Sequence, residues 1–488
     1  MSELTSESST QGLARSADRA QRGKALSAFE QLRRRHMADA AALAPEMIAR
    51  IGWSADRLAA HRQDRLRALV TSAVARSPWH AERLAGLDVE RLDETSLDEL
   101  PAMTKDDLMD RFDEIVTDER LTLASVNDHL ARLPQAGYLL GRYTAVASGG
   151  STGRRGVFVY DWSEWTSLYV GLCRYLLRAA SGSTPPTGAV VLASVAAGHP
   201  THPTAAWART FAGFPFDMVA LPVTLPVEEI VSGLNAVQPQ ILFAYPSALH
   251  LLTHEVAAGR LRIAPRRILA AAEPLLPEIR AAAERAWGQP VHNWWGASEG
   301  GGLGNPCELG RTHLGEDQVI IEAVDADGRP VPPGVTSDKI YLTNLYNNTL
   351  PLIRYEITDQ VTVLPERCPC GSVHRLIGDI QGRLDDVFRY RGRLVHPHVF
   401  RSPLSRRATV VEYQVRQTLR GAEIDVRCCG PLDVESLQRD IVHALARVGL
   451  TNPEVRVSTV ERIDRGVAGK LKRFVPLPAV RPAVRMTA

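Results

Sequence analysis

The stretch from Ser148 to Gly156 has the composition of a loop that could bind phosphate, because it reads SGGSTGRRG. Glycines allow a backbone to approach a ligand closely, hydroxyls donate hydrogen bonds, and arginines bind phosphate oxygens. A Walker loop opens a helix, whereas the apolar residues 157–160 that follow here favour a strand. The stretch predicts a hairpin tip, and taken alone it fits a polyphosphate cradle or a plain surface turn equally well.

A second group of residues has the types and spacing of metal ligands. Cys307 and His313 lie near one another in the chain, and Cys368 and Cys370 follow far downstream around a proline. Three sulfurs and one imidazole suit a closed, structural Zn²⁺ site that joins two loops. Free buried thiols are the alternative, and His374 could replace one ligand.

The elements that must position these residues predict an α/β protein. The first 95 residues are rich in alanine, arginine and leucine at helical spacing and predict a mostly helical region. Between residues 187 and 296, short apolar runs alternate with amphipathic segments, which predicts parallel sheets. The expected strands there are residues 189–194, 217–221, 240–244, 267–272 and 291–294.

The pattern changes after residue 315. Strands are expected at residues 319–323 and 339–345, which predicts a β subdomain. The last hundred residues predict a small α+β domain, with strands at 412–418, 423–428 and 454–461 and a helix at 434–448. With 488 residues, the chain exceeds the size of one ordinary core, so we expect an N-terminal domain of residues 1–384 and a C-terminal domain of residues 385–488.

Six more segments accompany the glycine-rich stretch in a characteristic order. They are LPAMTKDDL at 100–108, AAEP at 271–274, NWWGASE at 293–299, PLIRYEITD at 351–359, GRLDD at 382–386 and GKLKR at 469–473. In these segments the chain resembles the adenylate-forming superfamily, most closely phenylacetate-CoA ligase and its relatives, from about Leu66 to Phe474. Seven matches in the correct order make chance a poor explanation.

The resemblance implies a role for particular residues. It implies that Lys470 bridges the carboxylate and the α-phosphate, that Glu299 binds Mg²⁺, and that Ser298 lies near the α-phosphate. Asp385 would be the hinge of a mobile C-terminal lid. The nucleotide site would be formed by Ser148, Gly150, Ser151, Thr152, Gly153, Arg154, Ala272, Glu273, Pro274, Trp295, Asp359 and Arg383.

Within that site, Trp295 would stack on adenine, and Asp359 would accept hydrogen bonds from the ribose hydroxyls. The acid substrate would lie near Lys105, His199, Tyr245 and Gly296. Some relatives also carry a ligand set like Cys307, His313, Cys368 and Cys370, which strengthens the zinc prediction.

Two segments depart from the family pattern, and a basic run lies beside one of its key residues. Gly149 stands where a hydroxyl is usual, and Arg154 and Arg155 replace the lysine-bearing end of the phosphate loop, although arginine also binds phosphate. Residues 391–397 lack an expected asparagine. Lys472 and Arg473 read as a solvated basic run beside Lys470.

The resemblance implies activation of an aromatic acid, with a hydroxyl or amino substituent, by ATP to an acyl-adenylate. Coenzyme A is the expected acceptor, and an amine or a carrier-protein thiol is the alternative. A catalytically idle nucleotide-binding regulator is disfavoured because Glu299, Asp359, Arg383 and Lys470 are all present.

Composition narrows the expected partners and location. A net charge of +2 and a hydrophobic share of 45% predict a globular chain without a nucleic-acid partner. The absence of a signal peptide or an apolar span predicts a cytoplasmic protein without a membrane role, which could form a homodimer.

Overall fold

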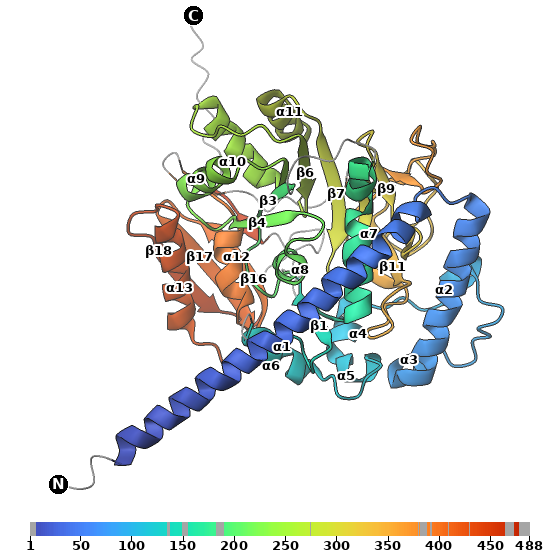
Figure 1. Ribbon diagram of the computed structural model, residues 1–488, viewed down its shortest axis with the longest axis horizontal. Coiled ribbons are helices and arrows are strands. Elements are labelled where there is room, and N and C mark those ends of the chain that lie inside the picture. Colours follow the sequence, from blue (N-terminus) through green and yellow to red (C-terminus); the bar gives the residue numbers. More distant parts are fainter. Residues whose placement is uncertain are drawn as a thin grey trace, which may run out of the picture.

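The computed structural model describes residues 6–133, 137–148, 155–181, 190–273, 275–378, 380, 388–390, 393–407, 409–428, 430–463 and 473–477. In Figure 1 the long helix α1 (Ser6–Arg50) crosses the front of the molecule, and its N-terminal end extends away from the body. No helix in these ranges is long and apolar enough to cross a membrane.

The N-terminal region is helical, as predicted. It contains α1, α2 (Ala55–Arg76), α3 (Pro78–Arg83), the 3₁₀ helix η1 (Glu94–Glu99), α4 (Lys105–Asp110), α5 (Phe112–Ile115) and α6 (Leu123–Ala131). Helix α2 buries the apolar stripe Leu58, Leu66, Leu69 and Val70. Helix α1 packs along α7 (Trp162–Ser181) and α8 (Pro203–Phe211).

An eight-stranded sheet forms the centre of the molecule. Its order is β13-β9-β8-β7-β6-β5-β3-β4. The five strands expected from the sequence are β3 (Val191–Ala196), β4 (Asp217–Pro222), β5 (Ile241–Ala244), β6 (Arg267–Ala271) and β7 (Val291–Ala297). They pair in parallel, which confirms the prediction. Strands β8 (Gly301–Pro306), β9 (Thr312–Leu314) and β13 (Leu376–Ile377) extend the sheet in antiparallel fashion.

Helices connect the parallel strands. Helix α8 joins β3 to β4, and α9 (Val227–Val237), α10 (Pro246–Ala257) and α11 (Pro277–Trp287) join the later strands. Helix α10 contacts both α9 and α11, and the three lie together in the upper part of Figure 1. These helices cover the middle of the sheet, where β5 and β6 are buried along almost their whole length, whereas the edge strand β4 is partly exposed.

Smaller sheets surround this core. Strands β10 (Val319–Val324), β11 (Lys339–Asn344) and β12 (Tyr355–Ile357) form the expected β-rich part. Strands β1 (Tyr143–Ala147) and β2 (Val157–Asp161) form an antiparallel hairpin.

The C-terminal segment has a hydrophobic cluster of its own, which contains Phe388, Phe400, Leu437 and Phe474. Its elements are β14 (Phe388–Tyr390), β15 (Arg393–Val395), α12 (His398–Ser405), β16 (Val410–Gln417), β17 (Gly421–Cys428), α13 (Val434–Arg447), β18 (Glu454–Thr459) and β19 (Phe474–Val475). The predicted strands and helix therefore lie where the sequence placed them. The expected boundary at residues 384 and 385 lies outside the described residues.

Candidate functional site

The two ends of the predicted phosphate loop come together at the mouth of the β1–β2 hairpin. Ala147 pairs with Val157, the Ser148 amide donates to the Gly156 carbonyl, and the Gly156 amide donates to Ser148 Oγ, both at 2.9 Å. A Cβ on Gly156 would lie 2.9 Å from the Phe158 ring, so a larger residue would not fit. Gly150, Ser151, Thr152, Gly153 and Arg154 lie outside the described residues.

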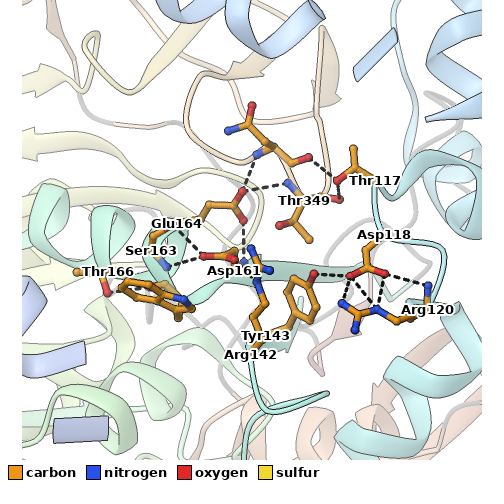
Figure 2. Close-up of polar contacts among 12 residues, drawn as sticks. Thr117, Asp118, Arg120, Arg142, Tyr143, Asp161, Ser163, Glu164, Thr166 and Thr349 are labelled. Atoms are coloured by element: carbon orange, nitrogen blue, oxygen red, sulfur yellow. Dashed lines mark hydrogen bonds and ion pairs between the residues drawn. The ribbon is translucent and has the colours of Figure 1, made fainter. Parts of the chain in front are cut away.

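The far end of this hairpin is held by a buried carboxylate, shown in Figure 2. Glu164 accepts backbone hydrogen bonds from Asp161 at 2.7 Å, from Asn348 at 2.8 Å and from Thr349 at 3.0 Å. Burial raises the pKa of Glu164 to about 7. These bonds fix the hairpin against the loop that precedes the predicted ribose-binding segment.

The centre of the site contains Lys105, Trp295, Glu299 and Asp359. The Trp295 indole donates to Asp359 Oδ2 at 2.9 Å. Lys105 opens α4, and Thr104 caps this helix. The preceding residue, Met103, exchanges backbone hydrogen bonds with Arg354 and Glu356, so the segments at 100–108 and 351–359 lie side by side.

The three charged groups at this centre influence one another. Burial lowers the pKa of Lys105, and the nearby negative charges of Glu299 and Asp359 oppose this effect. Burial raises the pKa of both carboxyl groups, and Lys105 opposes that change. An ammonium group and two carboxylates thus share one buried region, which could orient an acid and hold a hard cation.

The turn after β7 contains Ser298, predicted to lie near the α-phosphate, and Glu299, predicted to bind Mg²⁺. The Tyr160 hydroxyl donates to the Ser298 carbonyl, and the Asn344 amide donates to the Glu299 carbonyl at 2.9 Å. A Cβ on Gly296 would lie 3.1 Å from the Gly301 carbonyl oxygen, so this position favours glycine. The backbone of the turn is therefore fixed from two sides.

The carboxyl ends of β5 and β6 bring Tyr245 and Glu273 together. Glu273 accepts from Ser247 Oγ at 2.6 Å and from the Ser247 amide at 3.0 Å, and its other oxygen lies 3.1 Å from His396 Nε2. Burial alone would raise the pKa of Glu273, but His396 and Ser247 lower it to about 2. Ala272 has a φ of 69°, a left-handed value that strains a residue with a side chain. Pro274 lies outside the described residues.

Sequence reasoning missed the C-terminal side of this cluster. Tyr245 is buried and stacks on His398 at 5.3 Å and on His396 at 6.0 Å between ring centroids. The only signal available was the short segment at 391–397, which departs from the family pattern. The C-terminal segment therefore reaches the edge of the sheet where the predicted nucleotide and acid residues lie.

Two neighbouring cavities follow the end of β3. The larger, of about 250 Å³, is lined mainly by small side chains, by the hydroxyls of Ser194 and Thr204, and by Arg209. The smaller, of about 40 Å³, includes Ser148 and His199. His199 thus lines the smaller cavity, and Ala197 and Gly198 contribute to both.

The four predicted zinc ligands come together. One ligand atom from each of Cys307, His313, Cys368 and Cys370 lies within 4.8 Å of the others. His313 Nδ1 lies 2.9 Å from the His374 carbonyl, so Nδ1 carries the proton and the Nε2 lone pair faces the thiols. His374 contributes its carbonyl here, while its ring contacts the Leu314 carbonyl.

Burial raises the pKa of the Cys307 thiol to about 12. A nearby cation favours the thiolate, and three sulfurs with one imidazole suit Zn²⁺. The residues therefore fit this metal.

Three further predicted residues, Arg383, Asp385 and Lys470, also lie outside the described residues, as does Lys472. The interpretation of Arg473 as part of a solvated run is wrong. Its side chain is buried, lies over the Tyr413 ring at 5.1 Å, and is close enough to lower the pKa of Lys105. It enters the core because the following residues, Phe474 and Val475, pair with β16.

Comparisons with known proteins give several related sequences, among them phenylacetate-coenzyme A ligases. No family model matches the chain. The phenylacetate-coenzyme A ligase of Thermus thermophilus is 30% identical over 274 residues, which cover 49% of this chain and 61% of that protein. The phenylacetate-coenzyme A ligase of Aromatoleum evansii is 24% identical over 269 residues, which cover 51% and 60%. The chain thus spans less than two thirds of the length of these curated relatives.

Solved structures extend the comparison to most of the chain. A structure of 2-hydroxyisobutyryl-CoA ligase, in complex with 2-HIB-AMP and CoA in the thioesterification state, aligns with a TM-score of 0.56. The sequence identity is 17%, and the alignment covers 88% of this chain and 91% of that chain. The chain therefore has the fold of the adenylate-forming ligases, and its sequence is related to that of the phenylacetate-CoA ligases.

Proposed function

We propose that the chain activates a carboxylic acid with ATP to form an acyl-adenylate and pyrophosphate, and then transfers the acyl group to coenzyme A. The observation that carries this proposal is the shared buried region of Lys105, Glu299 and Asp359. The relatives, which are CoA ligases, support the acceptor. An amine or a carrier-protein thiol would serve the same first step.

Each residue has a distinct part in the proposed reaction. Glu299 would hold Mg²⁺, which supplies charge neutralisation at the phosphates when bound. Lys105 would orient the acid carboxylate, and Asp359 would accept the ribose hydroxyls. Lys470, outside the described residues, would bring a second positive charge when the C-terminal segment closes, with Asp385 as the hinge.

We further propose an aromatic acid with a hydroxyl or amino substituent. The cavity of about 250 Å³ at the end of β3 has mostly small apolar walls, and its polar groups come from Ser194, Thr204 and Arg209. Polar groups that would be left unpaired by an unsubstituted ring reject it more strongly than an apolar wall can. His199 lines the smaller neighbouring cavity and could contribute to the same recognition.

The test is acid-dependent exchange of labelled pyrophosphate into ATP by the full chain. We expect exchange with substituted benzoates or arylacetates, and a decrease of at least about a hundredfold in Lys470→Ala, since one charge aimed at the transition state contributes this much. Lys339→Ala is a control, because Lys339 forms a partly exposed ion pair with Glu356. Exchange only with fatty acids would contradict the aromatic substrate, and no exchange with any acid would contradict the activity.

We also propose one structural Zn²⁺ per chain at Cys307, His313, Cys368 and Cys370. All four positions of the tetrahedron would be filled by protein, so the metal would stabilise the loops and take no part in chemistry. Elemental analysis should find about one zinc per chain, and Cys368→Ala with Cys370→Ala should lose it. Cys173→Ala is the control, because this buried cysteine lies outside the cluster. Zinc retained in the double variant would refute the site.

A further inference from the structure

The larger cavity at the end of β3 has a single charged residue among the described residues that line it, Arg209 of α8. The other lining residues are small or apolar, apart from the hydroxyl-bearing Ser194 and Thr204. None of the described lining residues is an acid. A permanent cation therefore borders a cavity whose own walls supply no negative charge.

The guanidinium of Arg209 has unpaired hydrogen-bond donors. Its Nε and Nη1 atoms are buried and have no hydrogen-bond partner within the described residues. Burial lowers the pKa of Arg209, and only Tyr138 opposes the decrease, whereas a carboxylate beside the group would also have opposed it. Buried donors without a partner are costly, so a group that accepts from them would bind favourably.

The titratable groups that Arg209 influences, Tyr138 and His129, are neutral at pH 7. Burial raises the pKa of Tyr138 to about 12, against smaller opposing effects from Thr210 and Arg209. Burial lowers the pKa of His129 to about 4, and Arg209 lowers it further. Neither neighbour supplies a negative charge to Arg209.

Helix α1 packs against α8 at Arg209. The Arg209 Cζ atom lies 5.9 Å from the centre of the Phe29 ring. The acid next to that ring, Glu30, accepts from Arg33 through both of its oxygens, each at 2.8 Å. Glu30 is therefore already paired, and α1 offers Arg209 an aromatic face at this point.

The cavity is large enough for an aromatic ring with a substituent. Its volume is about 250 Å³. An apolar cavity of ~150 Å³ is enough to hold benzene. The remaining space would accommodate a substituent of a few heavy atoms on the ring.

The polar groups of the cavity decide which substituent fits. The hydroxyls of Ser194 and Thr204 can donate or accept, so they do not discriminate between a hydroxyl and an amino group. A guanidinium only donates. An oxygen substituent can accept from Arg209, whereas an aromatic amino group would turn its own N–H groups toward a cation.

We propose that Arg209 determines the specificity of this cavity, which receives an oxygen substituent of the acid, a hydroxyl or a second carboxylate, and rejects an amino group. The inference rests on the proposed function, which places the ring substituent in this cavity, and it narrows that substituent to an oxygen acceptor. Arg209 binds the substituent and takes no part in making or breaking bonds.

Pyrophosphate exchange by the full chain with matched acids tests the proposal. Hydroxybenzoate and aminobenzoate substituted at the same ring position have nearly the same size, so the ratio of their kcat/KM values isolates the effect of the acceptor. We expect the wild type to prefer the hydroxy acid at least about tenfold in the meta or the para series, Arg209→Gln to lose most of this preference, and Arg209→Lys to keep part of it. Arg285→Gln, which changes an exposed arginine on α11, should keep the wild-type ratio. A ratio near one in the wild type, or an unchanged ratio in Arg209→Gln, would overturn the proposal.

The benzenedicarboxylate of each series separates an anionic oxygen group from a neutral one. Faster exchange with the dicarboxylate than with the hydroxy acid would identify a second carboxylate as the substituent, and the reverse would identify the hydroxyl. In both cases the preference over the amino acid of the series has to depend on Arg209. A folding defect would lower exchange with every acid and leave the ratio unchanged, so it would not imitate the expected result.

Calorimetric titration of the full chain with the same acids separates this proposal from the ligase activity. If no acid supports exchange but binding of the hydroxy acid is still preferred through Arg209, the specificity of the cavity stands and the ligase activity falls. If exchange occurs and Arg209→Gln leaves the ratio unchanged, the reverse holds.

Discussion

Trp295 and Asp359 are joined by a hydrogen bond that affects the charge of the carboxylate. Burial raises the pKa of Asp359, and the indole N–H, at 2.9 Å from Oδ2, lowers it again. In the proposed nucleotide site, Asp359 would accept two ribose hydroxyls, and it would have to be ionised to accept both. The tryptophan would then contribute through its N–H as well as through its ring, and a phenylalanine would provide the ring alone.

Trp295→Phe tests this contribution. Loss of one hydrogen bond to a charged group costs about 1.5–3 kcal/mol, so we expect ATP affinity to fall about tenfold or more. Loss of this hydrogen bond should also raise the pKa of Asp359 further. As the solution is acidified, the variant should therefore lose ATP binding at a higher pH than the wild type does. ATP titrations between about pH 5 and 8 measure both effects.

The neighbouring Trp294→Phe is a matched control. Trp294 is buried on the opposite side of the strand, and its Nε1 has no hydrogen-bond partner within the described residues. It should change ATP affinity little at any of these pH values. Identical pH profiles for Trp295→Phe and the wild type would show that the indole N–H does not tune Asp359.

At the scale of elements, the β1–β2 hairpin is held at both ends. The Ser148 and Gly156 backbone bonds close its loop end, and Glu164 joins its other end to residues 348 and 349 (Figure 2). A hairpin of two short strands is only marginally stable by itself. The buried carboxylate therefore supports the position of the phosphate loop from a distance.

Glu164→Gln should loosen this support. Both carboxylate oxygens of Glu164 accept hydrogen bonds from backbone N–H groups. The side-chain NH₂ of glutamine would face one of these N–H groups, which leaves that donor unpaired at a cost of about 1–3 kcal/mol. Because the folded-state pKa of Glu164 is raised to about 7, its stabilisation is greatest at low pH and decreases as the pH rises from about 4.5 to 7. Urea unfolding should therefore show a difference between variant and wild type that is larger at pH 5 than at pH 8.

Arg120→Gln provides the comparison for this element. Arg120 pairs with Asp118 at the exposed side of the same region in Figure 2, and its side chain is 61% exposed. Asp118 is 12% exposed but keeps its hydrogen bond from Tyr143, so this variant should lose less stability than Glu164→Gln does. A Glu164→Gln variant with unchanged stability would mean that the hairpin does not depend on these bonds.

At the scale of the whole molecule, local patterns predicted the elements, and the ordered segments named the residues of the candidate site. The apolar runs at 240–244 and 267–272 became β5 and β6 because a strand buried on both faces is apolar throughout. Cys368 and Cys370 lie close to Cys307 and His313, as their residue types suggested. These features leave a signal within a few residues of the chain.

Contacts between distant segments left no such signal. Glu273 and His396 are 123 positions apart and pair only because the C-terminal segment lies against the sheet edge in this conformation. Arg473 looked like a surface charge, but the strand pairing of Phe474 buries it. Neither outcome could be deduced from periodicity, because each depends on how two separately formed parts meet.

The Glu273–His396 pair should contribute much of the attachment of the C-terminal segment. The side chains are only 12% and 1% exposed, and His396 also stacks on Tyr245 and His398. Removing one partner of a buried pair costs up to ~3–5 kcal/mol, since the other is left without compensation. Because the pKa of Glu273 is lowered to about 2, its stabilisation is complete above about pH 4.5 and is lost as the pH falls toward 2.

His396→Ala should therefore lower the free energy of unfolding at pH 7, and the difference from the wild type should shrink below about pH 4. Arg393→Gln is the matched control, because Arg393 also reaches across from the C-terminal segment, to Glu228 at 3.8 Å, but with side chains that are 50% and 67% exposed. Its loss should cost less than about 1 kcal/mol. Denaturant unfolding of both variants at pH 7 measures the two losses of stability. If the two variants are equally stable, the C-terminal segment is attached by its apolar contacts and the Glu273–His396 pair adds nothing.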